Sequence, residues 1–305
     1  MKENFMTKTW VVCLGALLCC ALWGSAFPCI KIGYELFAIP GEAVGSQILF
    51  AGWRFAFAGI LVILIGSLME RKLLLPKRES CGKILKLSML QTVAQYLFFY
   101  IGLANTTGVK ASIITGVNVF IAILVASLIF HQEELTLQKM LGSLVGLLGV
   151  VLVNVTGDGL GGGFTLFGDG FIVLSTVAYA FSSVFLKRYS KAEHPLVLSG
   201  YQFLVGGIIM IVCGALMGGR LEVISAHGVI MLLYLAMVSA VAYSLWGMLL
   251  KYNPISKVAV FGFMNPVFGV ILSALLLQEA DSLGGMCIAA LGLVCVGIYI
   301  VNCKK

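Results

Sequence analysis

The sequence predicts an all-α membrane protein with ten transmembrane helices, arranged as two inverted five-helix repeats. The first observation is composition: 60% of the 305 residues are hydrophobic and 11% are charged, whereas soluble domains carry about 25% charged residues. The second is that the apolar residues form ten runs near the length of about 20 residues that spans a bilayer. The third is an internal similarity between the two halves of the chain.

The ten apolar runs leave little chain for a soluble domain. In lipid, backbone groups are satisfied only within helices or closed barrels, and runs this long exclude a barrel. The runs are residues 9–30, 46–69, 84–104, 111–130, 138–155, 168–187, 196–217, 228–250, 257–277 and 283–302.

The internal similarity is clearest where YLFFYIGLANTTGVKASIITGVN (residues 96–118) is followed later by YSLWGMLLKYNPISKVAVFGFMN (residues 243–265). Each copy holds an apolar run, a short polar break ending in Lys, and a second apolar run. Such self-similarity indicates a repeat architecture. Three residues recur at one constant offset, since 243 − 96, 257 − 110 and 265 − 118 are all 147: Tyr96, Lys110 and Asn118 recur as Tyr243, Lys257 and Asn265.

The match extends over the whole chain in order. WGSAFPCIK (23–31) aligns with YAFSSVFLK (179–187), and GWRFAFAGI (52–60) with GYQFLVGGI (200–208). We therefore expect a first repeat over residues 9–155, a Gly-rich linker over 156–167 and a second repeat over 168–302. Because five is odd, the second repeat enters the membrane from the opposite side. Inverted repeats of this kind are typical of alternating-access transporters, which bind substrate near the midplane at the repeat interface.

The net charge of +7 is explained by topology and needs no nucleic acid. With a cytoplasmic N-terminus, sixteen of the 20 Lys and Arg residues fall in inner segments, which is the positive-inside pattern. We expect a multi-pass protein of the plasma (inner) membrane with both termini cytoplasmic. Its expected partners are the lipid bilayer and a small-molecule substrate.

Arg54 is the most costly residue within the predicted spans. An Arg at the centre of a spanning helix costs about 2.5–3.5 kcal/mol on insertion scales, and every Asp and Glu falls in a loop or at a helix edge. Arg54 either faces a wet cavity and binds a substrate carboxylate or phosphate, or it snorkels or caps carbonyls of a neighbouring helix. Its repeat counterpart is Gln202, which can form hydrogen bonds but carries no charge.

Asn118 and Asn265 occupy matched positions near the start of their helices. A buried amide requires hydrogen-bond partners, so the pair either binds substrate across the pseudo-axis or holds helices together. Pro266 directly follows Asn265 and removes a backbone donor, which frees a carbonyl one turn earlier.

Aromatic side chains also recur between the repeats. They suit the wall of an amphipathic cavity, although packing or an interfacial belt explains any single one of them. The full set of candidate substrate-binding residues is Trp23, Arg54, Gln95, Tyr96, Asn118, Tyr179, Ser182, Gln202, Tyr243 and Asn265.

Catalytic and metal-binding patterns are not apparent in the sequence. The three His residues lie in separate loops, and no zinc-protease, hydrolase or P-loop motif is present. We expect no enzyme activity, no metal and no cofactor. The nine Cys residues are expected to pack as small hydrophobic thiols.

Several segments together resemble the EamA branch of the drug/metabolite transporter superfamily. They are WGSAFP in the first helix, Arg54-Phe55 in the second, NPVFGVILSALLLQE in the ninth, and the paired spacings Gly142/Gly149 and Gly285/Gly292. The resemblance covers nearly the whole chain. It implies a secondary transporter, often an exporter of amino acids or related metabolites, with a cavity lined by helices 1, 3, 4, 6, 8 and 9. It places helices 5 and 10 at the end of the bundle or in a dimer contact.

The chain departs from this family pattern in two ways. Val119 stands in the first repeat where Pro266 stands in the second, which predicts a straighter fourth helix. The membrane-embedded Glu of small multidrug resistance relatives is also missing, so uniport, exchange and coupling through other groups stay open.

The leading hypothesis is therefore an alternating-access transporter that exports or exchanges small polar metabolites such as amino acids. A non-transporting receptor or assembly subunit is the alternative, and a membrane enzyme is third. A homodimer is also open, because Gly142 and Gly146 stand four residues apart and suit close helix approach.

Overall fold

The computed structural model describes residues 5–106, 111, 114–154, 164–276 and 285–303, and all secondary structure within these residues is helical. Each predicted apolar run coincides with a helical segment. The segments are Thr9–Leu36 (α2), Val44–Glu70 (α3), Arg78–Ala104 (η1 Arg78–Ser80, α4 Cys81–Leu87, η2 Ser88–Ala94, α5 Gln95–Ala104), Ile114–Ile129 (with α7 Asn118–Leu124 and η3 Val125–Ile129), Leu137–Asn154 (α8), Leu166–Tyr189 (η5 Leu166–Gly170, α9 Phe171–Tyr189), Pro195–Leu216 (α10), Ala226–Tyr252 (α11), Ile255–Leu276 (α12 Ile255–Ala259, η6 Val260–Phe263, α13 Met264–Leu276) and Gly285–Asn302 (α14).

The chain is a multi-pass membrane protein. Six of the described segments are long and apolar enough to cross a bilayer, and four further apolar helices are shorter over their described residues. Large apolar side chains such as Leu64, Leu68 and Ile288 are exposed on the outside of the bundle. An apolar surface of this kind is stable when the surrounding solvent is lipid.

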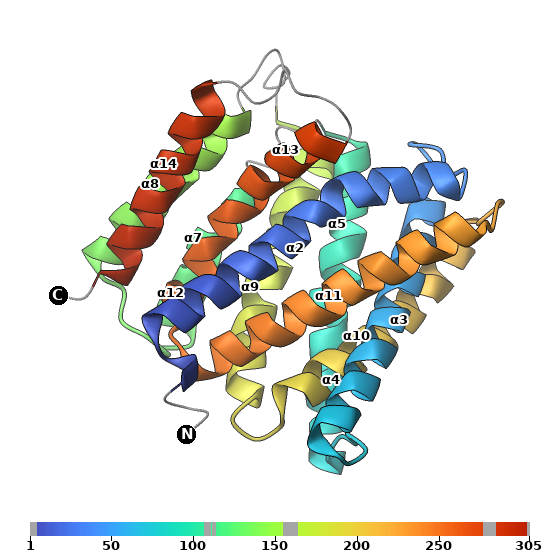
Figure 1. The fold of residues 1–305 in the computed structure, drawn as a ribbon, viewed down its shortest axis with the longest axis horizontal. Coiled ribbons are helices and arrows are strands. Elements are labelled where there is room, and N and C mark those ends of the chain that lie inside the picture. Colours follow the sequence, from blue (N-terminus) through green and yellow to red (C-terminus); the bar gives the residue numbers. More distant parts are fainter. Residues whose placement is uncertain (1–4, 107–110, 112–113, 155–163, 277–284, 304–305) are drawn as a thin grey trace.

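The helices pair between the two halves of the chain (Figure 1). The α3 helix packs along α10, and α8 packs along α14 at one edge of the bundle. The α2 helix contacts α11 and α13, and in the other half α9 contacts α5 and α7. Numbered along the chain, these contacts join helices 2 with 7, 5 with 10, 1 with 8 and 9, and 6 with 3 and 4.

A seam of glycines brings α3 and α10 into backbone contact. A Cβ placed on Gly52 would lie 2.6 Å from the backbone nitrogen of Ile211, and one on Gly214 would lie 2.6 Å from that of Leu49. Gly45, Gly52 and Gly59 follow one another at intervals of seven, as do Gly200, Gly207 and Gly214. Close approach of this kind strengthens van der Waals packing, which drives helix association in lipid.

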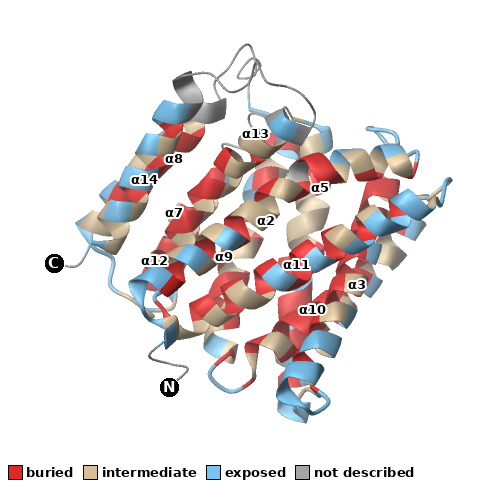
Figure 2. Ribbon diagram, in the orientation of Figure 1, coloured by how far each residue is buried: buried red, intermediate tan, exposed pale blue. Residues whose placement is uncertain are grey.

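One end of the bundle holds both chain termini and is joined by polar contacts (Figure 1). We call it the terminal end. Glu133 accepts hydrogen bonds from the backbone and side chain of Ser256 and pairs with Lys139 at 2.9 Å. Lys187 Nζ donates to the Asn253 carbonyl at 2.7 Å. Figure 2 shows that burial is concentrated in the packed centre, whereas α8 and α14 expose much of their surface.

The first helix extends further than expected. The first apolar run was predicted to end at residue 30, yet α2 continues through Pro28 to Leu36. The helix beyond Pro28 is held by burial of Cys29, followed by Phe37 just past the helix end. Packing therefore compensates for the hydrogen bond that proline removes.

The other boundaries differ less. The second repeat was expected to begin at residue 168, and its first helical turn begins at Leu166. Most of the predicted Gly-rich linker, residues 156–163, lies outside the described residues. Asp169, 2% exposed, lies in the first turn of this segment and accepts a hydrogen bond from Thr165 N.

Gly142 and Gly146 face neighbours within the same chain. A Cβ on Gly142 would lie 2.6 Å from Val301 Cγ2 of α14, and one on Gly146 would meet the Phe263 ring. The spacing that suggested a dimer is therefore used for packing inside the monomer.

Candidate functional site

Two tyrosines that are repeat counterparts meet at the centre of the bundle. The hydroxyl groups of Tyr96 on α5 and Tyr243 on α11 are 2.8 Å apart and share a hydrogen bond. The Trp23 ring of α2 lies 5.0 Å from the Tyr243 ring in an edge-to-face arrangement. These contacts join three of the predicted site residues in one cluster, which also includes Phe55, stacked 5.4 Å from Phe203.

Arg54 lies in the interior of the bundle. Its side chain on α3 is 3% exposed, and its Nε donates to Ser239 Oγ of α11 at 3.0 Å. Its guanidinium carbon is 5.2 Å from the Phe55 ring centre. Burial excludes the snorkelling alternative, and among the described residues no carboxylate forms an ion pair with Arg54.

The counterpart of this contact is found in the other half. Gln202 of α10, fully buried, donates from Nε2 to Gln91 Oε1 at 2.5 Å. Gln202 follows Arg54 by 148 residues, and Ser239 follows Gln91 by the same 148. Equivalent residues therefore make equivalent contacts, from helix 2 to helix 8 and from helix 7 to helix 3.

A π-helical turn explains why the repeat offset changes within helix 3. The offset is 148 residues at Gln91 and 147 at Tyr96, so the first half holds one extra residue between them. This residue falls in η2, whose π-helical geometry accommodates it. Such π-bulges are frequent at functional sites. Without it, Tyr96 would be rotated away from the position that matches Tyr243.

Several of the predicted site residues have a buried side-chain polar atom without a partner among the described residues. Such atoms include Trp23 Nε1, Gln95 Oε1, Asn118 Oδ1 and Asn265 Oδ1. A buried polar atom without a hydrogen bond costs about 1–3 kcal/mol. Unpaired buried atoms also occur elsewhere in the described structure, for example at Ser127 and Ser143. At the site residues a bound ligand would supply the missing partner.

The two asparagines stand where their helices change geometry. Asn118 is the first residue of α7, and Asn265 follows the 3₁₀ turn η6, one residue before Pro266. The irregular turn of helix 9, residues 260–263, lies about one turn before Pro266, which is where the proline was expected to free a carbonyl. Helix 4 is less regular than expected, because it ends in the π-helical turn η3. No contact joins the two amides in the described structure.

Ser182 and Tyr179, two further predicted residues, lie close to each other on α9 but differ in their contacts. Ser182 is fully buried and donates to the Tyr179 carbonyl of its own helix at 2.7 Å, which is a local helix contact. Tyr179 packs against the cluster that contains Tyr243.

Sequence reasoning missed four residues that complete the cluster: Phe55, Gln91, Phe203 and Ser239. A serine or phenylalanine in an apolar helix carries little signal by itself. The equal offset of 148 residues in the pairs Arg54/Gln202 and Gln91/Ser239 was the available indication.

Comparison with known proteins agrees with this architecture. The sequence profile of the EamA-like transporter family matches twice, over residues 10–155 and 166–303. An uncharacterized transporter of Archaeoglobus fulgidus is 27% identical, with 98% of this chain and 100% of the relative covered. An uncharacterized inner membrane transporter of Escherichia coli, YedA, is 25% identical over 93% of this chain and 90% of its own.

A plant protein and a solved structure are also similar to this chain. A WAT1-related chloroplast protein of Arabidopsis thaliana is 26% identical, over 92% of this chain and 66% of its own length. One solved crystal structure superposes with a TM-score of 0.79 at 16% identity, over 95% of this chain and 96% of its own, and so shares the fold. The family is a transporter family and not an enzyme family, and the relatives from Archaeoglobus fulgidus and Escherichia coli are named as transporters. The chain belongs to the EamA-like transporter family and is a membrane transporter.

Proposed function

We propose that this transporter works by alternating access and carries small zwitterionic metabolites such as amino acids, by export or exchange. In this proposal two inverted five-helix repeats, residues 9–155 and 168–302, enclose a substrate site at their interface. The termini and the terminal end are cytoplasmic in the plasma membrane, as the distribution of Lys and Arg favours.

The paired contacts between the halves support the inverted repeat. A two-fold axis relates helix 1 to 6, 2 to 7, 3 to 8, 4 to 9 and 5 to 10. Under that operation the packing of α2 on α11 becomes that of α9 on α5, and the α3–α10 and α8–α14 pairs map onto themselves. Two halves that are built alike can exchange tilts, which gives inward- and outward-open states of similar energy.

The observation that carries the substrate class is Arg54. It is a buried cation whose one hydrogen bond in the described structure goes to a neutral hydroxyl. A buried charge requires a counter-ion, and a substrate carboxylate supplies one in a bidentate geometry that suits guanidinium.

The aromatic rings beside Arg54 suit the other end of a zwitterion. Trp23 and Tyr243 present faces and edges within one cluster, and an ammonium group over such a face gains about 0.5–2 kcal/mol. The amides of Gln95, Asn118 and Asn265 offer unpaired acceptors for its N–H groups. A substrate that is both carboxylate and amine uses every one of these features.

The test is flux in proteoliposomes reconstituted with purified protein and loaded with labelled amino acids. Wild type is expected to exchange at least one of them, and Arg54→Ala to lose most of that flux. Arg220→Ala is the matched control, because Arg220 is exposed and, among the described residues, its side chain has no hydrogen bond; its backbone N–H donates to Ser46 Oγ. Equal flux in Arg54→Ala and wild type for every substrate would remove Arg54 from the site.

A further inference from the structure

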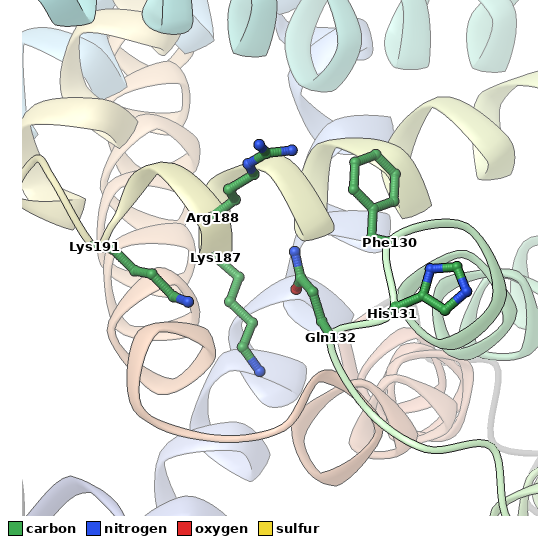
Figure 3. A pocket seen from close by; sticks show the side chains of 6 residues that line it. All are labelled: Phe130, His131, Gln132, Lys187, Arg188 and Lys191. Carbon is green, nitrogen blue, oxygen red and sulfur yellow. The ribbon is translucent and has the colours of Figure 1, made fainter.

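A second cationic site lies at the terminal end, separate from the central cluster. It is a hollow of about 460 Å³ between the end of helix 4 and the end of α9 (Figure 3). Three basic residues from α9 and the turn after it lie on one side of the hollow, with Arg188 and Lys187 extending in opposite directions, and polar and aromatic residues at the end of helix 4 lie on the other side. The lining residues are Phe130, His131, Gln132, Lys187, Arg188 and Lys191.

We propose that this pocket binds a phosphate-bearing anion at the membrane boundary. Three cations within five residues of chain repel one another, and an anion bound between them relieves that repulsion. Phosphate is the anion for which Lys and Arg side chains are best suited, with Arg supplying paired N–H donors and Lys a compact charge.

The cations are only partly used by the protein itself. Lys187 donates one of its three N–H bonds to the Asn253 carbonyl, and cations near a helix C-terminus stabilise it through the dipole. Arg188 and Lys191 are exposed, and their side chains form no hydrogen bond or ion pair with other described residues. Both Lys187 and Arg188 lie in the last turn of α9, so both stabilise the helix through its dipole. Only Lys187 also has a hydrogen bond, and the charged groups of Arg188 and Lys191 stay accessible to a ligand.

The nearest carboxylate does not neutralise the pocket. Glu133 is the acidic neighbour of Lys187, but it is held by Lys139 at 2.9 Å and by the Ser256 backbone at 3.0 Å. The charge of Glu133 is thus already paired on the far side of the loop. Glu134, which lines an adjoining hollow together with His131 and Gln132, sets one negative charge against the three positive charges of Lys187, Arg188 and Lys191. The net charge around the pocket is therefore positive.

The surroundings suit a lipid headgroup as one source of the phosphate. Leu128 and Ile129 are exposed just before the pocket on helix 4, so an acyl chain could run along them while the headgroup enters the hollow. The Phe130 ring lies 5.2 Å from the Phe185 ring and closes the apolar side. A free phosphate or phosphate ester in solution is the other source of the same chemistry.

The test compares three proteins in detergent: wild type, Arg188→Gln/Lys191→Gln and the control Lys72→Gln/Arg78→Gln. The control removes the same charge from exposed residues on the same end, outside the pocket. Unfolding temperatures without ligand establish that all three are folded. Native mass spectrometry measures binding of phosphatidylglycerol against phosphatidylcholine, and thermal shift measures binding of inorganic phosphate.

We expect the pocket variant to bind phosphatidylglycerol about tenfold more weakly than wild type, because each Lys or Arg near an anionic lipid headgroup strengthens binding of that lipid and the variant lacks two. The control should bind it as wild type does. A loss confined to inorganic phosphate would support the pocket and identify a soluble anion as the source. Equal binding by all three proteins, or no binding of either probe to wild type, would overturn the proposal.

Discussion

The glycine seam between α3 and α10 gives the sharpest stability prediction. Gly52→Ala places a methyl group 2.6 Å from the Ile211 nitrogen and 3.0 Å from the Gly207 carbonyl oxygen, whereas ordinary contact begins near 3.4 Å. The helices must separate by roughly 0.8 Å, the difference between 3.4 and 2.6 Å. The obstacle is backbone, so no side-chain rotation relieves it.

The magnitude follows from two opposing effects. Overpacking costs about 1–3 kcal/mol, and the rigid backbone contact places Gly52→Ala near the upper end. Replacing Gly by Ala in a helix returns about 1 kcal/mol. The net expectation is a loss of about 2 kcal/mol in the free energy of unfolding.

The matched control is Gly292→Ala. Gly292 lies on an exposed face of α14, and a Cβ there meets nothing within 4 Å. The change should leave stability unaltered or raise it by up to about 1 kcal/mol. Both variants are compared by thermal unfolding in one detergent. Equal unfolding temperatures for Gly52→Ala and Gly292→Ala would refute the close α3–α10 contact.

Three further predictions concern the site and the terminal end. Arg54→Lys should transport less than wild type although it keeps the positive charge, because Lys lacks the paired N–H donors that bind a carboxylate in bidentate geometry. Flux equal to wild type in the proteoliposome assay would show that only the charge matters. Tyr243→Phe removes the hydrogen bond to Tyr96, which is expected to lower stability by about 1 kcal/mol and to reduce flux more strongly; unchanged flux would exclude this pair from the site. Burial by itself raises the pKa of Glu193. Hydrogen bonds from the Lys77 and His194 backbone lower the pKa by more than burial raises it, so the pKa in the folded protein is below the usual 4.5. A carboxyl group with a lowered pKa stabilises the fold at pH values above its pKa in the unfolded chain. This stabilisation is lost as the pH falls through its pKa in the folded protein. Glu193→Gln should therefore unfold at a lower temperature than wild type at pH 7, and the difference should shrink below about pH 4.5; a difference that does not change with pH would contradict the assignment.

The helical segments were predictable because hydrophobicity alone determines where a chain can cross lipid. Every predicted run coincides with a helix, but the positions of the helix ends were predicted less well. The α2 helix runs to Leu36 instead of residue 30, because packing of the buried Cys29 compensates for the backbone hydrogen bond that Pro28 removes. The seven-residue spacing of Gly45, Gly52 and Gly59 was visible in the sequence, whereas its partner helix depends on tertiary packing.

The site was predicted in part. Recurrence identified Tyr96 and Tyr243, which do meet, as the proposed two-fold relation between the halves would require of counterparts near its axis. The partner of Arg54 was not found, since Ser239 resembles any helix serine. The π-helical turn η2 corresponds to a change of one residue in the repeat offset. This change could be interpreted only after the contacts of Arg54 and Gln202 showed which residues are equivalent.

The most direct measurement of the central claim locks the terminal end. Glu133 and Ser256 belong to different halves and are in hydrogen-bond contact there. Glu133→Cys and Ser256→Cys, in a chain whose native cysteines are replaced by Ala, can be joined by a short cleavable cross-linker and then released by reduction. If the halves exchange tilts during transport, flux in proteoliposomes stops on cross-linking and returns after cleavage. Flux that continues at the uncross-linked rate would contradict alternating access between these two halves.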